Sequence, residues 1–169
     1  KQMCGNAKYT DLGIFSFHPV KHIACGEGGM ITTNNEKLYK SLLKLRTHGI
    51  TKEKMSENHG GWYYEMQELG YNYRLTDIQS ALGISQLNKN EKGVIIRNQI
   101  AERYKRAFQG VLKYQSLPAN SFNAHHLFVV EVEDRLGLYN YLLGHNIFAQ
   151  IHYIPAHMLP YYKKIGYDD

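Results

Sequence analysis

The sequence contains few of the residues that cross-link small proteins or assemble metal centres. It has two cysteines, Cys4 and Cys25. They do not form a C-x-x-C pair, so a disulfide framework is disfavoured and a reducing, cytoplasmic compartment is expected. Among the nine histidines, His125 and His126 are adjacent and would face opposite sides of a strand. Because no cysteine or acidic partner stands at ligand spacing, we expect no metal site.

Long apolar runs and concentrated charge are also missing. No apolar run is long enough to cross a bilayer, so we expect no membrane association. The formal net charge is +5, but the basic residues are spread along the chain, whereas nucleic-acid binding requires a concentrated patch. A mild positive charge suits the steering of an anionic small molecule such as a nucleotide sugar, or only keeps the protein in solution. With 43% hydrophobic and 21% charged residues, the composition is that of an ordinary globular protein.

The stretch Gly13–Gly29 reads G-I-F-S-F-H-P-V-K-H-I-A-C-G-E-G-G, and the rest of the chain is organised around it. Its apolar, aromatic start predicts a strand over Leu12–Phe17, and a second strand, Met30–Thr33, follows the glycine turn. Lys21 lies between them, where a pocket floor is expected, and partial desolvation there would favour a neutral, nucleophilic amine. The Ser16 hydroxyl is near enough in sequence to bind an anion beside the same pocket. A solvated surface lysine is the alternative interpretation.

Capping residues and apolar spacing predict the other elements. The expected helices are one that carries Leu38, Leu42 and Leu45 between the Asn34-Asn35 cap and Gly49, one from the Thr76–Gln79 capping box to Phe108 with a kink at Gly93, and one between Asp134 and Gly144. The expected later strands are 127–132 and 147–153. Residues 48–72, rich in glycine and aromatic side chains, are expected to form an irregular loop that packs on the surface or reaches an active site.

The spacing S-F-H-x-x-K followed by G-E-G-G resembles the cofactor-lysine motif of the pyridoxal-phosphate (PLP) sugar aminotransferases, the DegT/DnrJ/EryC1/StrS family. The resemblance implies that Ser16 binds the cofactor phosphate and that Lys21 binds PLP covalently. It also implies an α/β architecture, the fold-type I of the aspartate-aminotransferase-like PLP transferases. Further segments in the family's order extend the likeness over essentially the whole chain: Leu45–Gly49, Leu69–Gln79 and His152–Tyr162.

Within the family, Trp62–Arg74 after His48–Thr51 is similar to the branch that acts in pseudaminic-acid biosynthesis. The resemblance implies transfer of an amino group from L-glutamate to a UDP-linked 4-keto-6-deoxy sugar. The identity of the nucleotide sugar and the stereochemistry of amination stay open. Some relatives instead dehydrate deoxysugars and carry histidine in place of the lysine, so the presence of Lys21 favours transamination.

The resemblance also assigns further site residues. Asn72 occupies the position of the family's G-x-N-x-R asparagine, which reaches the partner subunit's PLP phosphate, so a homodimer is implied. Arg74 either helps to place the anionic substrate or forms a structural salt bridge. His152 and Tyr153 fall in a segment that lines the sugar pocket in relatives, although a packed histidine is the alternative. His18 is expected near the cofactor or substrate, or in a packing role.

Compared with the family, the chain is expected to hold the later part of the large domain and most of the small C-terminal domain. The expected division is residues 1–75 for the large domain, 76–108 for a long connecting helix and 109–169 for an incomplete small α/β domain. The family's acidic partner of the pyridine nitrogen, its ring-stacking group and its glycine-rich phosphate turn precede this stretch. We therefore expect an internal fragment that is inactive by itself. A non-catalytic binding module of the same fold is the rival hypothesis.

Overall fold

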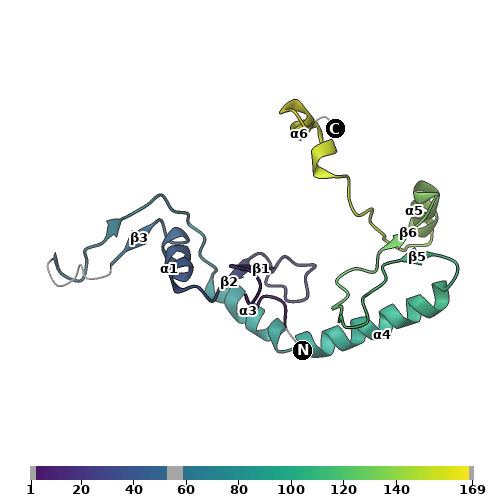
Figure 1. The fold of residues 1–169 in the computed structure, drawn as a ribbon, viewed down its shortest axis with the longest axis horizontal. Helices are drawn as coiled ribbons and strands as arrows, with labels where there is room; N and C mark the ends of the chain where they lie inside the picture. Colours follow the sequence, from purple (N-terminus) through teal and green to yellow (C-terminus); the bar gives the residue numbers. More distant parts are fainter. Residues whose placement is uncertain (1–2, 53–58, 168–169) are drawn as a thin grey trace. The chain divides into compact units, whose positions relative to one another are not determined.

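A computed structural model describes residues 3–52 and 59–167 of the chain (Figure 1). The structure divides into two compact units, Lys1–Ile95 and Ile96–Asp169, and each is described by itself. Among the described residues, the buried apolar side chains are Cys25 in the first unit and Ala101 in the second, at 1% and 2% exposure, and Gly49 is buried as well. No helix of the described residues is both long enough and apolar enough to span a bilayer.

The first unit contains both predicted strands, and they pair as a hairpin. Strand β1 (Gly13–Ser16) pairs antiparallel with β2 (Gly29–Thr32), and Ser16 stands opposite Gly29. The Thr32 hydroxyl donates a 2.6 Å hydrogen bond to the Gly5 carbonyl, which ties the leading segment to the hairpin. Alternating exposure along β1 is the pattern of a strand with one covered face.

Helix α1 (Glu36–Leu45) follows, and its cap confirms the sequence prediction. The Asn35 side chain accepts hydrogen bonds from the Lys37 and Leu38 amides, which satisfies two N–H groups that the first helical turn cannot pair. The chain then reverses through His48 and Gly49, both with left-handed backbone angles. The Gly49 amide donates to the Lys44 carbonyl at 2.9 Å, so the helix ends by a turn at the expected place.

Residues 48–72 are not wholly irregular, which corrects the sequence expectation. Strand β3 (Ile50–Thr51) pairs antiparallel with β4 (Glu65–Met66), and a 2.7 Å ion pair joins Lys44 of α1 to Glu68 just after β4. The two strands are two residues long, too short for an alternating pattern to identify them in the sequence. Residues 53–58 between them lie outside the described residues.

The expected long helix is two helices. Helix α3 (Asp77–Leu87) starts with the predicted capping box, and α4 (Asn90–Phe108) follows after a break at Asn88 and Lys89. The Lys89 amide donates to the Gln86 carbonyl, three residues back, so the last turn of α3 tightens. The expected kink at Gly93 is absent, because Gly93 lies inside α4 and its amide bonds the Lys89 carbonyl at 3.0 Å.

In the second unit, strand β5 (Lys113–Tyr114) pairs antiparallel with β6 (Val130–Glu131). Tyr104 of α4 and Tyr114 of β5 pack against Phe128, with ring centroids 5.2 and 5.6 Å away. Because aromatic pairs bury large apolar areas, this cluster holds the strand pair to the helix.

Helix α5 (Arg135–Gly144) has the predicted cap and end, since the Asp134 carboxylate accepts from the Gly137 amide at 2.8 Å. The expected strand 127–132 is shorter, and 147–153 is not a strand. A strand needs a paired neighbour, and residues 147–153, despite their apolar alternation, have none within the described part of the chain. The remaining elements are the 3-10 turn η1 (Ala156–Met158) and α6 (Pro160–Lys164).

Substituting Gly70 tests its close approach to the backbone of His48 and Gly49. A methyl group on Gly70 would overlap the Gly49 backbone nitrogen and lie 2.9 Å from its Cα. Because backbone cannot yield as a side chain does, we expect Gly70→Ala to lower the free energy of unfolding by about 1–3 kcal/mol, measured by urea denaturation. Gly61→Ala is the control, because no described atom lies within 4 Å of its added methyl. Equal values for the two variants would contradict this packing.

Candidate active site

Residues 17–28, which join β1 to β2, form a closed loop that contains Lys21, and we call them the Lys21 loop. Its first turn is held by the Lys21 amide, which donates to the His18 carbonyl at 2.9 Å. Pro19 stands second in this turn, where its fixed φ is favourable. Two more bonds close the loop: the Phe17 amide donates to the Gly28 carbonyl at 2.8 Å, and the Cys25 amide to the Phe17 carbonyl at 3.0 Å.

Ser16 directly precedes the loop, and His18 and Lys21 are the two ends of its first turn. Ser16 is the last residue of β1 and is exposed, and its Oγ accepts a long, 3.4 Å hydrogen bond from the His18 amide. This bond uses the oxygen as an acceptor, so the hydroxyl hydrogen is available to a ligand. Lys21 is partly buried. A hydroxyl therefore stands just before the loop, and a primary amine stands at the end of its first turn.

His18 faces an acidic residue across the loop. Its Nε2 lies 3.9 Å from a Glu27 carboxylate oxygen, and the two side chains are 49% and 74% exposed. Exposed pairs of this kind contribute less than about 1 kcal/mol. The contact therefore indicates where the His18 ring lies but does not hold the loop in place.

Cys25 and helix α3 both hold the far end of the loop, at Glu27. The Cys25 thiol donates to the Glu27 carbonyl at 3.3 Å, and the same carbonyl accepts a 3.0 Å hydrogen bond from the Gln79 side-chain amide. A methyl group on Gly28 would lie 2.8 Å from Leu75 Cδ1 and 3.1 Å from the Cys25 sulfur. The backbone at Glu27 and Gly28 is therefore pressed against the segment that starts α3.

Asn72 and Arg74 form a second group in the first unit. Arg74 Nε donates a 2.8 Å hydrogen bond to Asn72 Oδ1. Because a guanidinium has only donors, it fixes the amide oxygen toward itself and leaves the Asn72 NH₂ group to donate elsewhere. The backbone is fixed as well, by a bridge between Asn72 and Thr47. Both side chains are exposed, so the pair presents a donor-rich, positively charged surface.

His152 and Tyr153 belong to the second unit. Their rings stack with centroids 4.2 Å apart and planes at 28°, and both residues are exposed, Tyr153 at 73%. Tyr153 therefore offers a ring face and a hydroxyl to solvent, which are groups that commonly contact sugars and bases.

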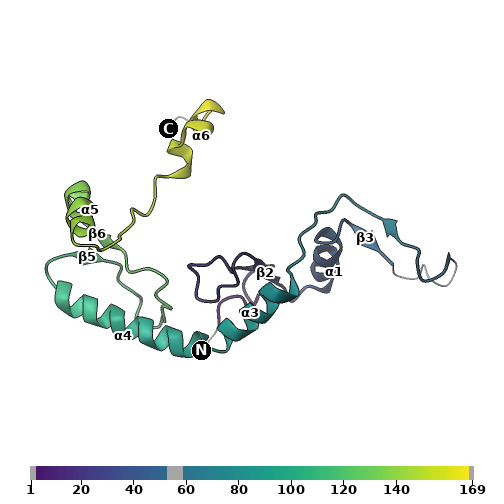
Figure 2. The ribbon, with the colours of Figure 1, turned by 180° about the vertical axis from the view of Figure 1, so that it is seen from behind.

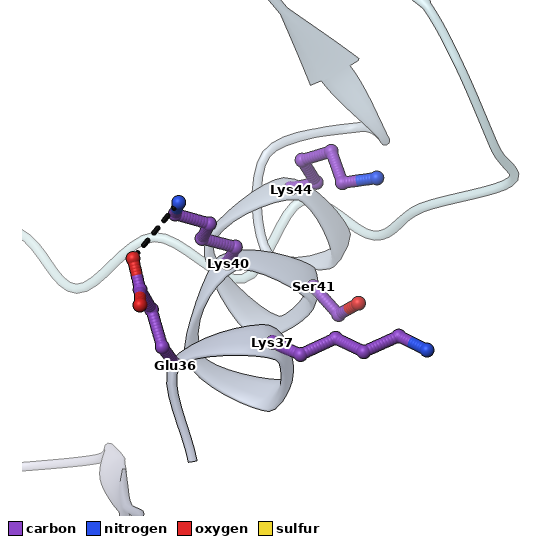
Figure 3. Close-up of a pocket in the computed structure, with 5 residues that line it drawn as sticks. All are labelled: Glu36, Lys37, Lys40, Ser41 and Lys44. Atoms are coloured by element: carbon purple, nitrogen blue, oxygen red, sulfur yellow. Dashed lines mark ion pairs between the residues drawn. The ribbon is translucent and has the colours of Figure 1, made fainter. Parts of the chain in front are cut away.

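The lysine face of α1 is separate from these groups. Figure 3 shows Lys37, Lys40 and Lys44 along a shallow hollow, with Glu36 bound to Lys40 at 2.9 Å. None of the candidate site residues lines this hollow. An i,i+4 pair on an exposed helix stabilises the helix by a few tenths of a kcal/mol, on the order of 0.5 at most, so this face is a charged helix surface.

Metal-binding groups do not gather in the described part of the chain, which contains no cluster of three or more histidine, cysteine or acidic side chains that could hold an ion. Both cysteines are free, Cys4 exposed and Cys25 buried. In the second unit, burial lowers the pKa of His125, and the nearby Lys105 ammonium lowers it further while Glu102 opposes. Both effects favour the neutral imidazole of His125.

Three residues of the site were not predicted: Cys25, Glu27 and Gln79. The sequence identified Gln79 only as the N3 residue of the capping box. In that role its Oε1 accepts a hydrogen bond from the Thr76 amide at 3.2 Å. A side-chain amide also has two donors, so the unused NH₂ group was a signal that Gln79 has a second partner. The burial of Cys25 follows the general tendency of free cysteines.

Known proteins resemble this chain in sequence and in fold. The model of the DegT/DnrJ/EryC1/StrS aminotransferase family matches residues 1–169. A Campylobacter jejuni serotype O:2 protein, UDP-4-amino-4,6-dideoxy-N-acetyl-beta-L-altrosamine transaminase, is 36% identical over 165 aligned residues, which cover 94% of this chain and 42% of that protein.

Two solved structures resemble the chain closely. Helicobacter pylori PseC, an aminotransferase involved in the biosynthesis of pseudoaminic acid, gives a TM-score of 0.84 at 27% identity over 95% of this chain and 44% of that one. The sugar aminotransferase candidate Spr1654 from Streptococcus pneumoniae, in its PLP form, gives a TM-score of 0.84 at 28% identity over 95% and 42%. The chain thus spans less than half of the length of each protein.

Substituting the loop glycines tests how the loop is seated. Gly26 and Gly28 both have positive φ, at +88° and +149°, but only Gly28 is crowded by Leu75 and Cys25. We expect Gly26→Ala to cost about 1–2 kcal/mol from backbone strain alone. Gly28→Ala should cost about 1–3 kcal/mol more through overpacking. Urea denaturation measures both values, and a Gly28→Ala variant as stable as Gly26→Ala would refute the contact.

Proposed function

Because the chain belongs to the DegT/DnrJ/EryC1/StrS aminotransferase family, we propose that the protein is a PLP-dependent sugar aminotransferase in which Lys21 binds the cofactor. Its fold is that of part of a fold-type I sugar aminotransferase, which confirms the α/β expectation. The observation that carries the proposal is the Lys21 loop, which holds a primary amine at the end of its first turn, just after the strand that ends with the Ser16 hydroxyl.

The residues present fit PLP by their chemistry. PLP offers an aldehyde, which a primary amine attacks, and a phosphate, which neutral N–H and O–H donors bind. Lys21 supplies the amine, Ser16 the hydroxyl hydrogen, and Asn72 an amide NH₂ group whose orientation Arg74 fixes. When bound, PLP supplies an electron sink for the negative charge that develops on the amino donor's α-carbon.

In this proposal the chain's own residues bind, orient and transfer a proton. Ser16 Oγ would donate a hydrogen bond to the cofactor phosphate. Lys21 Nζ would hold the cofactor covalently at rest, and during transfer the same amine would take up the proton of the amino donor's α-carbon and later give a proton back. The turn His18–Lys21, closed by a 2.9 Å hydrogen bond, fixes the backbone position from which the lysine side chain extends.

The names of the relatives support one choice of substrates. We propose L-glutamate as the amino donor and a UDP-linked 4-keto-6-deoxy sugar as the acceptor in surface-glycan biosynthesis, since the Campylobacter relative is named for a UDP-linked amino sugar. His18, Arg74, His152 and Tyr153 are the proposed substrate contacts. Arg74 suits the diphosphate because a guanidinium binds phosphate oxygens in pairs. Two free thiols support a reducing, cytoplasmic location.

Replacing Lys21 tests the central assignment. We expect Lys21→Ala to lower the rate of amino transfer by about a thousandfold or more, because it removes both the covalent attachment and the proton-transferring amine. Lys21→Arg is the matched control, since it keeps the positive charge but no longer has a nucleophilic amine. The measurements use the full-length protein, because this chain alone is expected to be inactive: amino transfer from glutamate to a UDP-4-keto-6-deoxy sugar, and intact mass after borohydride treatment with PLP. A Lys21→Ala variant that still turns over would end the proposal.

We also propose a homodimer in which Asn72 reaches the cofactor of the partner subunit. Large apolar side chains on the same stretch are exposed, with Leu69 at 84%, Tyr73 at 70% and Ile78 at 83%. Contiguous exposed apolar residues commonly mark an association surface. Because Asn72 lies among them with its NH₂ group available, it is suited to act across such a surface.

A mixed-dimer experiment tests this arrangement. We expect Asn72→Ala to weaken PLP binding about tenfold, the effect of losing a hydrogen bond to a charged group, and Lys21→Ala to be inactive. Mixed dimers of the two variants contain one site with both Lys21 and Asn72, so activity should rise above that of either variant. The measurement is amino transfer after the two purified variants exchange subunits. If mixing restores nothing while exchange is verified by mass, Asn72 does not serve the partner's site.

A further inference from the structure

We infer that Gln79 is a positioning residue for Lys21, through the backbone of the Lys21 loop. The inference rests on the proposed function, because it concerns how the chain holds the residue that binds PLP. Gln79 would act through the hydrogen bonds of its side chain to Thr76 and Glu27. Its side-chain amide joins the start of α3 to the far end of the loop, 52 residues away in sequence.

Both ends of the Gln79 amide are used. Its Oε1 accepts from the Thr76 amide at 3.2 Å and from the Thr76 hydroxyl at 3.0 Å. Its Nε2 donates to the Glu27 carbonyl at 3.0 Å. Because an amide is planar and cannot rotate one end without the other, the cap of α3 determines where the donor points, and the donor determines where Glu27 lies.

From Glu27 the constraint passes along backbone hydrogen bonds. The next carbonyl, that of Gly28, accepts from the Phe17 amide at 2.8 Å, and the Phe17 carbonyl accepts from the Cys25 amide at 3.0 Å. Phe17 lies between Ser16 and the turn that holds Lys21. Moving Glu27 therefore moves the residue on which the spacing of Ser16 and Lys21 depends.

Packing supports the same contact. Cys25 is 1% exposed, and a methyl group on Gly83 of α3 would lie 3.7 Å from its Cβ. This apolar contact brings the loop onto α3 but is not directional. A hydrogen bond has a preferred distance and angle, so Gln79 supplies the directional element that fixes where along the helix the loop lies.

Gln79→Glu separates this role from helix capping. A glutamate keeps the acceptor oxygens for Thr76, and T-x-x-E is itself a capping box, so the melting temperature should stay within about 2 °C of wild type or rise. The donor to Glu27 is lost, and a carboxylate oxygen would face the Glu27 carbonyl oxygen. Thr76→Val is the control, because it removes the hydroxyl cap of α3 but keeps both the Gln79 donor and the Thr76 amide, whose hydrogen bond to Oε1 still orients the side chain.

Two readouts follow each variant. In the PLP-free protein, hydrogen–deuterium exchange of the Phe17 and Cys25 amides should be about fivefold faster in Gln79→Glu, about 1 kcal/mol. With PLP alone as the probe, the dissociation constant measured from visible absorbance should rise about fivefold. In Thr76→Val the melting temperature should fall while both readouts stay within about twofold of wild type, a margin below 0.5 kcal/mol.

The outcomes separate this inference from the proposed function. If borohydride fixes no PLP on Lys21 of the unaltered full-length protein, the proposed function fails, and hydrogen exchange of the PLP-free protein still tests the Gln79–Glu27 contact. If wild type binds PLP and Gln79→Glu matches it in either readout, Gln79 does not position Lys21. Should Gln79→Glu fold poorly, Gln79→Met removes the same donor without adding charge and is read by the same two measurements.

Discussion

The antiparallel pairing of β1 with β2 is the constraint on which the candidate site depends. It places Ser16 opposite Gly29, so the connecting residues leave and return at fixed points. The Phe17–Gly28 hydrogen bond extends this pairing by one step, and the turn that carries Lys21 starts directly after it. Each such bond contributes only about 1 kcal/mol. The conformation of the loop therefore depends on several contacts together, including those that it makes with α3.

Local signals in the sequence were enough for the parts of the fold that depend on neighbouring residues. Asn35, Thr76 and Asp134 all cap helices as expected, because a cap needs only a side-chain acceptor two or three residues before the amides it binds. The strands on either side of the Lys21 loop were likewise predicted from their apolar, aromatic composition. The grouping of Ser16, His18 and Lys21 belongs to the same class, since all three lie within six consecutive residues.

Features that depend on distant partners could not be predicted in the same way. Residues 147–153 have an apolar strand-like pattern but no paired neighbour among the residues that the structure describes, whereas Lys113–Tyr114, with no such pattern, pairs with β6. A pattern indicates which face of a segment would be apolar, but not which segment lies beside it. The Gln79–Glu27 bond is of this kind too, because nothing near Gln79 in the sequence indicates a partner 52 residues away.

The segment around Thr76 carries two groups of side chains that are directed differently, one on each side of the helix cap. Before the cap, Asn72 and Arg74 are exposed and hydrogen-bonded to each other, which suits a group offered outward to another molecule. After the cap, Gln79 bonds inward to the chain's own Lys21 loop. A capped helix start is rigid, because its first amides are already paired, so the outward and inward groups keep a fixed relation. In the proposed dimer this would make one short segment serve two cofactor sites, the partner's through Asn72 and its own through Gln79.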